Sequence, residues 1–354
     1  MSDFNVMTYG ATGNGSTDDT AAFNAAISAL NTAGSGVLVV PSAPNYYNIS
    51  GSLSSITAKA WVRGDTVAGS RLGIYGGNGI IFDRTAANNG VCRITDVWVE
   101  QRNSISSPST YGISYLGGTP GNTLEQQFWC ERCQIFGNWQ YGLYLNITGG
   151  NRSVIRDVNV YGDSAHFTRT DRAFFIYNPG GNVTLIDCQA QWVNISFYVD
   201  GLPTTPTEGT VFRGCEGSAV NYGVIATDYT ANTQLYDCFF NQYNIAVQIG
   251  SRGQNDIDGL YVLWNSNSAV GIECTGGMTL IRNCRMFGQG WTAIVGIQLE
   301  AQYNKVSSCL IGDAGIGLLF GNSCQTCSGR DLTFFGCSTN YIDNGSGNSI
   351  TDIL

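Results

Sequence analysis

The sequence predicts an all-β chain that forms a right-handed single-stranded parallel β-helix of three sheets and about ten or more coils, with an N-terminal capping α-helix. A short motif, clearest at Leu235–Phe240, recurs along the chain, and its cysteine-or-aliphatic position repeats every 22 to 36 residues. That position is occupied by Val97, Cys133, Val158, Cys188, Cys215, Cys238, Leu260, Cys284, Cys309 and Leu332. Glycine is abundant (46 residues) and charged residues make up only 12% of the chain, which suits tight turns between strands.

The N-terminal segment predicts a cover for the end of the stack. Thr17 or Asp18 can cap a helix over 19–31, whose apolar residues share one face. Val37–Pro41 follows as the first buried strand. We therefore expect a loop and capping helix over residues 1–35 and one continuous β-helix domain over 36–354, with Asp18 and Asp19 in a structural role.

The run from Tyr9 to Phe23 and the strand ending at Pro41 resemble the N-terminal signature of the pectate-lyase-like right-handed parallel β-helix superfamily. Phage tailspikes and polysaccharide depolymerases carry this signature. The resemblance implies the fold and a polysaccharide ligand, and its tailspike members imply a homotrimer. The signature covers about the first 50 residues, so it is informative about the fold and much less so about chemistry.

Each coil divides into three short strands in which apolar and polar residues alternate, as in strands with one buried face. The residue before the repeating cysteine position is Asp, Asn or Gly in most coils, for example Asp237, Asn283 and Gly259. These three residue types share a tolerance of left-handed backbone, so we expect a structural corner there. Asp258 and Arg282 on adjacent coils are expected to form a surface ion pair.

Charge and cysteine content narrow the partners and the compartment. The formal net charge is −9 and no basic stripe exists, which disfavours a nucleic-acid partner. Twelve cysteines, most at inward positions, fit free buried thiols and folding in a reducing cytosol. Cys324 and Cys327 could instead form a disulfide or a ligand pair. We expect no secretory signal and no membrane segment.

Aromatic residues dominate part of the outward face of the first strand in each coil. Tyr144, Phe175, Tyr177 and Tyr198 are expected to form a solvent-facing ladder. Insertions at 101–110, 117–127, 162–172 and 201–209 would form walls on both sides of it. An aromatic floor between loops suits stacking against sugar rings, and it also suits a subunit interface.

Two carboxylates, Glu273 and Glu300, stand on the same sheet one coil and two residues apart, which separates their backbones by about 8 Å. This spacing fits an inverting glycosidase, in which a water lies between acid and base. Gln248 and Gln298 flank Glu273 and could hold sugar hydroxyls. Asp200, at the edge of the aromatic floor, is a further catalytic candidate.

A lyase would need a basic residue at the site, often beside a metal. The chain has two lysines, Lys59 and Lys305, and neither is expected to face this sheet. The only histidine, His166, falls in an insertion and is expected to be a solvated loop residue. We therefore expect no metal or other cofactor.

The sequence thus predicts a phage-tailspike-like virion protein, assembled in the host cytoplasm, that binds and hydrolyses a bacterial surface polysaccharide such as capsule or O-antigen. A homotrimer is expected, although the chain carries no long C-terminal extension of the kind that trimerises many tailspikes. A non-enzymatic receptor-binding adhesin and a polysaccharide lyase remain alternatives, and so does an extracellular location.

Overall fold

The computed structural model describes residues 1–86, 90–102, 109–117, 126–147, 152–164, 170–177, 182–250, 253–288 and 290–354. The chain folds as the predicted all-β parallel solenoid, of about 11 turns, with one α-helix among the described residues. It divides into two compact units, Met1–Asn194 and Ile195–Leu354. The prediction of one continuous domain over 36–354 stays a prediction.

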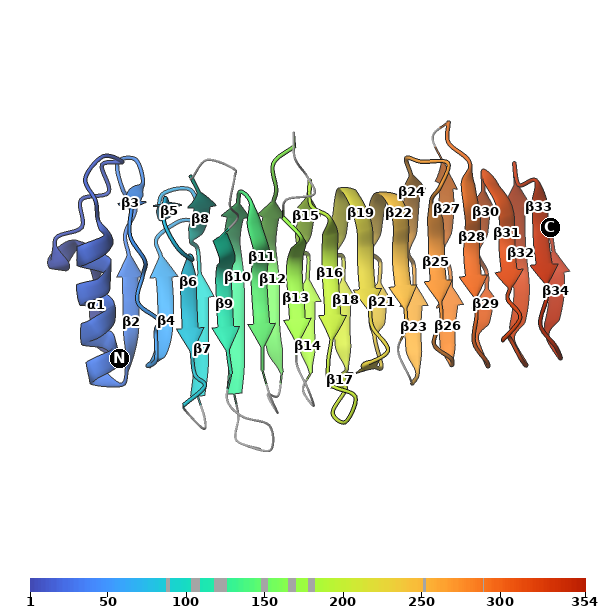
Figure 1. Ribbon diagram of the computed structural model, residues 1–354, viewed down its shortest axis with the longest axis horizontal. Coiled ribbons are helices and arrows are strands. Elements are labelled where there is room, and N and C mark those ends of the chain that lie inside the picture. Colours follow the sequence, from blue (N-terminus) through green and yellow to red (C-terminus); the bar gives the residue numbers. More distant parts are fainter. Residues whose placement is uncertain are drawn as a thin grey trace. The chain divides into compact units, whose positions relative to one another are not determined.

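In the unit Met1–Asn194, three parallel sheets run along the coils (Figure 1). The first sheet contains β6 (Ile80–Asp83), β9 (Ser109–Leu116), β11 (Trp139–Asn146) and β13 (Arg172–Tyr177). The second contains β1 (Asp3–Asn5), β2 (Ser35–Val40), β4 (Lys59–Gly64), β7 (Gly90–Thr95), β14 (Val183–Ile186) and the first halves of β10 (Gln126–Phe136) and β12 (Ser153–Tyr161). The third contains β3 (Tyr47–Ile49), β5 (Arg71–Ile74), β8 (Trp98–Gln101), β15 (Gln189–Gln191) and the second halves of β10 and β12.

The unit Ile195–Leu354 repeats the three sheets. Its first sheet contains β16 (Ile195–Asp200), β25 (Val270–Cys274), β28 (Ala293–Leu299), β31 (Ala314–Phe320), β33 (Thr339–Asp343) and the second halves of β19 (Glu216–Ala226) and β22 (Phe239–Ile249). The second contains β18 (Thr210–Arg213), β21 (Gln234–Tyr236), β23 (Asn255–Asp258), β26 (Thr279–Arg282), β29 (Lys305–Ser307), β34 (Ser349–Ile353) and the first half of β32 (Ser328–Phe335). The third contains β24 (Tyr261–Trp264), β27 (Arg285–Gly288), β30 (Leu310–Gly312) and the remaining halves of β19, β22 and β32. A separate pair, β17 (Thr207–Glu208) and β20 (Thr230–Ala231), lies in the turns.

The predicted cap is confirmed as α1 (Thr20–Ala33), which follows the short 3-10 helix η1 (Val6–Tyr9). Its apolar face, including Phe23, Ile27 and Leu30, is buried. The N-cap residue is Asp19, whose side chain makes no capping hydrogen bond, and Asp18 just before it accepts a hydrogen bond from the Thr20 backbone N–H (3.0 Å) through Oδ1. Asp19 is buried and accepts backbone N–H groups of the preceding loop, which confirms a structural role for the acidic pair.

The core matches the predicted alternation. Every residue of the repeating cysteine position is buried. All twelve cysteines are free, as expected, and eleven of them are buried. Several of these thiols donate a hydrogen bond to the carbonyl two residues earlier, as Cys284 does to Arg282 O (3.2 Å) and Cys309 to Ser307 O (3.2 Å). A thiol is thus a small apolar core residue that can also satisfy a backbone acceptor at the corner.

Cys324 and Cys327 are free as well, with their sulfur atoms 3.3 Å apart in the interior. The hydrogen bond from Cys324 lowers the pKa of the Cys327 thiol to about 7. Cys327 lies on a second-sheet coil between Asn304 and Asn348, and its N–H donates to Asn348 Oδ1 (2.9 Å). The pair therefore lies in a turn where a neighbouring asparagine side chain accepts a backbone N–H.

The corner between the second and third strands is left-handed, as the sequence predicts. The backbone φ is +51° at Asp187, +53° at Asp237, +55° at Asn283 and +71° at Gly259. In this region a Cβ crowds the following carbonyl, so only residues that tolerate the crowding are common. The corner residues thus close the coils and leave the outward faces free for other roles.

We expect Asp187→Val to lower the free energy of unfolding by about 1–2 kcal/mol, because a β-branched side chain is strained in the left-handed region. Asp187 is exposed, so the substitution creates no cavity. Asp187→Asn and Asp187→Gly keep the tolerance and are the matched controls. Urea unfolding measures all three, and equal stability of the valine and glycine variants would contradict the role given to the corner.

Candidate functional site

The first sheet of the unit Ile195–Leu354 carries the predicted outward row in the predicted register. Residues on adjacent strands pair directly along the coils. The row reads Tyr198, Ile225, Gln248, Glu273, Gln298 and Leu319. Their side chains are half-buried and face away from the core. Glu273 is paired with Gln298, so Glu300 lies one coil and two residues away, at the diagonal position the sequence predicts.

Each of the two predicted catalytic carboxylates accepts a hydrogen bond from a neighbouring amide. Gln248 Nε2 donates to Glu273 Oε2 (2.7 Å), and Gln298 Nε2 donates to Glu300 Oε1 (2.9 Å). The first bond draws the Glu273 carboxylate toward β22, on the preceding coil. The Glu300 carboxylate occupies the space above the Cα of Gly321, on the following coil, where an alanine methyl would overlap it. The two side chains therefore lean in opposite directions.

A third carboxylate, which the sequence analysis missed, leans toward Glu273. Asp228 lies in the turn after β19, and its Oδ1 occupies the space above the Cα of Gly250. Gly250 directly follows β22, two residues beyond Gln248. The carboxylates of Glu273 and Asp228 thus converge over one strand end, at positions separated by about 6.6 Å along the strand direction.

Asp228 and Gln248 line a pocket of about 430 Å³ on the first sheet. Glu273 does not line this pocket itself, but it is hydrogen-bonded to Gln248, which does. Its lining residues are Tyr198, Ile225, Ala226, Thr227, Asp228, Tyr229, Gln248, Gly250 and Thr275. A second pocket, of about 250 Å³, continues from Asp228 and Tyr229 to Leu202, Pro203 and Pro206. We call the two pockets together the first-sheet groove. The segment 201–209, one of the predicted walls, forms the edge of this groove. Pairing of β17 with β20 holds the segment in place.

Asp200 stands at the base of this wall. Its Oδ1 accepts hydrogen bonds from Thr227 Oγ1 (2.6 Å) and from the Gly201 backbone N–H (2.9 Å). Its backbone carbonyl accepts a third from Thr207 Oγ1. These contacts make Asp200 a positioning residue that fixes the 201–209 segment, and its predicted catalytic role stays a prediction.

The unit Met1–Asn194 holds the other three predicted aromatic residues. Tyr144 stacks on Tyr111 with ring centroids 5.3 Å apart, and Phe175 lies 5.0 Å from Tyr144 and 6.3 Å from Tyr177. The Arg172 guanidinium covers the Phe175 ring at 4.7 Å. We call this group the aromatic cluster.

The expectation of a fully solvent-facing ladder is wrong for one member, because Phe175 is only 9% exposed. Tyr144 and Tyr177 remain half-buried at the surface. Tyr141, at the start of β11, packs on Phe175 and adds to its cover, with ring centroids 5.2 Å apart. Phe175 is therefore a packed base for its neighbours.

Several predicted features lie partly outside the described residues. The predicted walls at 101–110, 117–127 and 162–172 include 103–108, 118–125 and 165–169, which the structure does not describe. His166 falls in the last of these ranges. Among the described residues, no three histidine, cysteine or acidic side chains gather as metal ligands would. Within the same residues, no helix is long and apolar enough to cross a membrane.

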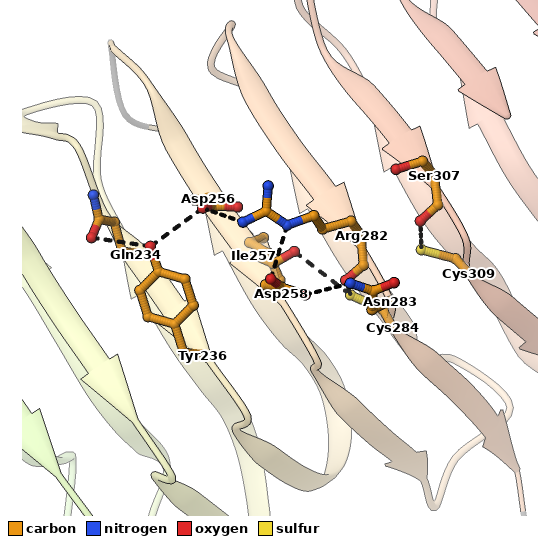
Figure 2. A network of polar contacts seen from close by, with 10 residues as sticks. All are labelled: Gln234, Tyr236, Asp256, Ile257, Asp258, Arg282, Asn283, Cys284, Ser307 and Cys309. Carbon is orange, nitrogen blue, oxygen red and sulfur yellow. Dashed lines mark hydrogen bonds and ion pairs between the residues drawn. The ribbon is translucent and has the colours of Figure 1, made fainter.

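A polar network covers the second sheet of the unit Ile195–Leu354 (Figure 2). Arg282 Nε donates to Asp258 Oδ2 (2.9 Å), which confirms the predicted pair, and Arg282 also binds Asp256 (2.9 Å). Asn283 Nδ2 donates to Asp258 Oδ1 (2.8 Å). Burial raises the pKa of Asp258, but the hydrogen bonds from Asn283 and Arg282 outweigh it and lower the pKa overall. Asp258 is thus held as an anion.

Comparison with known proteins supports the same fold. The model of the family "rhamnogalacturonase A/epimerase, pectate lyase-like" matches residues 4–56. No curated protein matches the sequence significantly. The resemblance inferred from Tyr9–Phe23 is therefore confirmed at the level of the superfamily, and the chain has the pectate-lyase-like parallel β-helix fold.

Among solved structures, the bacteriophage Phi29 gene product 12 N-terminal fragment aligns with a TM-score of 0.68 and 14% identity, over 99% of this chain and 71% of that one. The A-module of the Azotobacter vinelandii mannuronan C-5 epimerase AlgE6 aligns with a TM-score of 0.64 and 15% identity, over 99% and 98%. The tailspike of the E. coli bacteriophage HK620, solved with a pentasaccharide, aligns with a TM-score of 0.61 and 11% identity, over 98% and 66%. At these identities the similarity is one of fold.

The burial of Tyr144 has a measurable consequence. Burial, together with the neighbouring Tyr111, raises the pKa of Tyr144 to about 12. Between its unfolded value near 10 and this value, the folded chain holds a proton that the unfolded chain has lost, so stability falls as pH rises. We expect Tyr144→Phe to reduce this alkaline loss by about 1–2 kcal/mol, after allowance for partial solvent exposure.

Urea unfolding at pH 9 and pH 12 measures the difference. Tyr341→Phe is the matched control, because Tyr341 is 45% exposed and lies in the other unit. An alkaline loss of stability that is the same in wild type and Tyr144→Phe would contradict the buried position of this phenol.

Proposed function

We propose that the chain is a phage-tailspike-like protein that binds a bacterial surface polysaccharide and hydrolyses it in the first-sheet groove. The observation that carries the proposal is the convergence of the Glu273 and Asp228 carboxylates over the end of β22. Structural similarity to a tailspike solved with a pentasaccharide agrees with a saccharide ligand. The mannuronan epimerase neighbour agrees with a polysaccharide-related role, and the bacteriophage Phi29 neighbour agrees with a phage protein.

The strand positions toward which the two carboxylates lean, Gln248 and Gly250, are about 6.6 Å apart, a spacing compatible with hydrolysis with inversion. An inverting glycosidase places its two carboxyl groups roughly 6.5–9.5 Å apart, so that a water fits beside the sugar ring. One carboxyl group protonates the leaving oxygen while the other removes a proton from the water. Glu273 is a member of both candidate pairs. Its partner is Glu300 in the pair predicted from sequence, and Asp228 in the pair that the geometry favours.

Aromatic and amide side chains would hold the sugar. Tyr198 and Tyr229 border the first-sheet groove and offer ring faces to the apolar side of a pyranose. Gln248 and Gln298 present amide groups that can bond hydroxyls. Tyr144 and Tyr177 of the aromatic cluster are proposed as further sugar contacts, with Phe175 beneath them.

We expect Glu273→Gln and Asp228→Asn each to lower kcat at least about 100-fold while leaving polysaccharide binding intact, because each removes a proton-transfer group and keeps the shape. Glu300→Gln decides between the two pairings. It should leave kcat within a few-fold of wild type if Asp228 is the partner, and abolish cleavage if Glu300 is. Release of reducing ends from capsular and O-antigen polysaccharides is the measurement.

The same assay separates the competing functions. Binding without reducing ends from any polysaccharide would overturn hydrolysis and favour an adhesin. An unsaturated product that absorbs in the ultraviolet would favour a lyase. Unimpaired cleavage in both Glu273→Gln and Asp228→Asn would overturn the proposed pair.

We further propose that the protein is part of a virion tail and acts as a homotrimer, as its tailspike resemblance implies. Light scattering should then give about three times the chain mass of 37.9 kDa. A monomeric mass at micromolar concentration would contradict the trimer, and it would leave the first-sheet groove unaffected because the described groove residues come from one chain.

A further inference from the structure

A second groove, of about 790 Å³, lies on the second sheet of the unit Ile195–Leu354, over β21, β23, β26 and β29. Its lining residues are Asn232, Gln234, Gln254, Asn255, Asp256, Met278, Thr279, Leu280, Tyr303 and Lys305. We call it the second-sheet groove. It shares no lining residue with the first-sheet groove.

Two large side chains on its rim are held at the surface by a strained backbone. Met278 has φ +60° and Tyr303 has φ +61°, both in the left-handed region that long side chains rarely adopt. Their side chains are 47% and 54% exposed, so neither contributes much to the core. Folding alone would favour Asn or Gly at this position, which holds Asn232 two coils before Met278 and Gly347 two coils after Tyr303. Strain without a packing gain indicates a functional position.

The rim is rigid because a ladder of buried polar groups lies directly beneath it. Asn255 Oδ1 accepts the Thr233 N–H (3.0 Å), and Asn304 Oδ1 accepts the Thr279 N–H (2.8 Å). Asn304 Nδ2 also donates to Ala301 O (2.9 Å). The exposed Tyr303 ring and Met278 thioether are therefore presented on a fixed backbone, which lowers the entropy cost of binding.

The floor of the groove is polar and carries balanced charge. Asp256 accepts a hydrogen bond from Arg282 (2.9 Å) through Oδ2 (Figure 2). Its Oδ1 is buried and has no hydrogen-bond partner among the described residues. Lys305 forms no ion pair with any described residue. Leu280 separates the two charges, because β26 lies between β23 and β29. The groove thus offers an acceptor on one side, a donor on the other and an apolar strip between them.

We propose that the second-sheet groove is a binding site for an uncharged sugar residue of a glycan. The apolar face of a pyranose stacks on Tyr303 and contacts Met278, and its hydroxyls bond Asp256, Lys305 and the amides of Gln234 and Gln254. Balanced charge in the groove on an acidic chain gives no attraction for a polyanion. The proposal does not rest on hydrolysis in the first-sheet groove.

The test uses the full-length chain and neutral tetrasaccharides of glucose, mannose and galactose, with a hexuronate tetrasaccharide as the charged comparison. Saturation-transfer NMR and calorimetry should detect at least one neutral tetrasaccharide. Tyr303→Gly should weaken that binding about tenfold or more, because it removes the stacking surface. Lys305→Gln should weaken it less, and Lys59→Gln, at the only other lysine, should not affect it.

Thr326→Gly is the matched structural control. Thr326 is exposed and has φ +57° at the same position one coil beyond Tyr303, and it does not line the groove. Both glycine substitutions relieve the same backbone strain, so both should keep or raise the melting temperature. Only Tyr303→Gly should lose the sugar, whereas a purely structural role for Tyr303 predicts the same effect from both.

Three results would overturn the proposal. They are no binding of any neutral tetrasaccharide, undiminished binding by Tyr303→Gly, and tighter binding of the hexuronate than of every neutral probe. A change of mass in light scattering caused by Tyr303→Gly would instead identify the groove as an interface between copies of the chain. Repeating the titration with Tyr229→Ala separates this site from the first-sheet groove, because that variant loses a proposed sugar contact there and should still bind the tetrasaccharide through Tyr303 as wild type does.

Discussion

The left-handed corner between the second and third strands is the constraint on which the other features depend. At Asp187, Asp237, Asn283 and Gly259 the backbone bends at one left-handed residue, and the next residue points to the interior. Where that residue is cysteine, its thiol can donate to the carbonyl two residues earlier, and the corner leaves fewer backbone acceptors unsatisfied. Each coil therefore closes in the same register as the coil before it. A slip of one residue would turn every core side chain outward, so this register also determines which residues reach solvent.

A fixed register places the outward side chains of each sheet in regular rows. The direction in which each side chain leans then determines which functional groups come together. Glycines on neighbouring coils set that direction at two acidic positions. Gly321 leaves room for the Glu300 carboxylate, and Gly250 leaves room for that of Asp228. The Gln248 amide draws Glu273 toward the same strand end as Asp228. The chemistry of the first-sheet groove thus depends on these glycines, which leave space, as much as on the acidic residues themselves.

The difference between register and side-chain direction explains which features the sequence could predict. The fold, the cap, the corner, the free cysteines and the register of Glu273 with Gln298 follow from periodicity, which the sequence displays directly. The lean of Glu300 and the convergence of Asp228 depend on vacant space on the adjacent coil, which no periodicity reveals. Asp228 was missed because it stands in the turn after β19, three residues beyond Ile225 of the outward row. The burial of Phe175 was missed because Tyr141 and Arg172, at strand starts, pack over it.

The two grooves of the unit Ile195–Leu354 are built on the same physical principle, although they share no residue. In the first-sheet groove, acidic side chains occupy space that glycines leave open, and in the second-sheet groove, Met278 and Tyr303 occupy left-handed positions where asparagine or glycine would fold more easily. At Met278 and Tyr303 this choice strains the backbone without adding to the core. A stacked solenoid can carry such costs because each coil is held by two neighbours, and the rest of the register keeps the strained residues in position. Departures from the repeat are therefore the best guide to the sites of this protein.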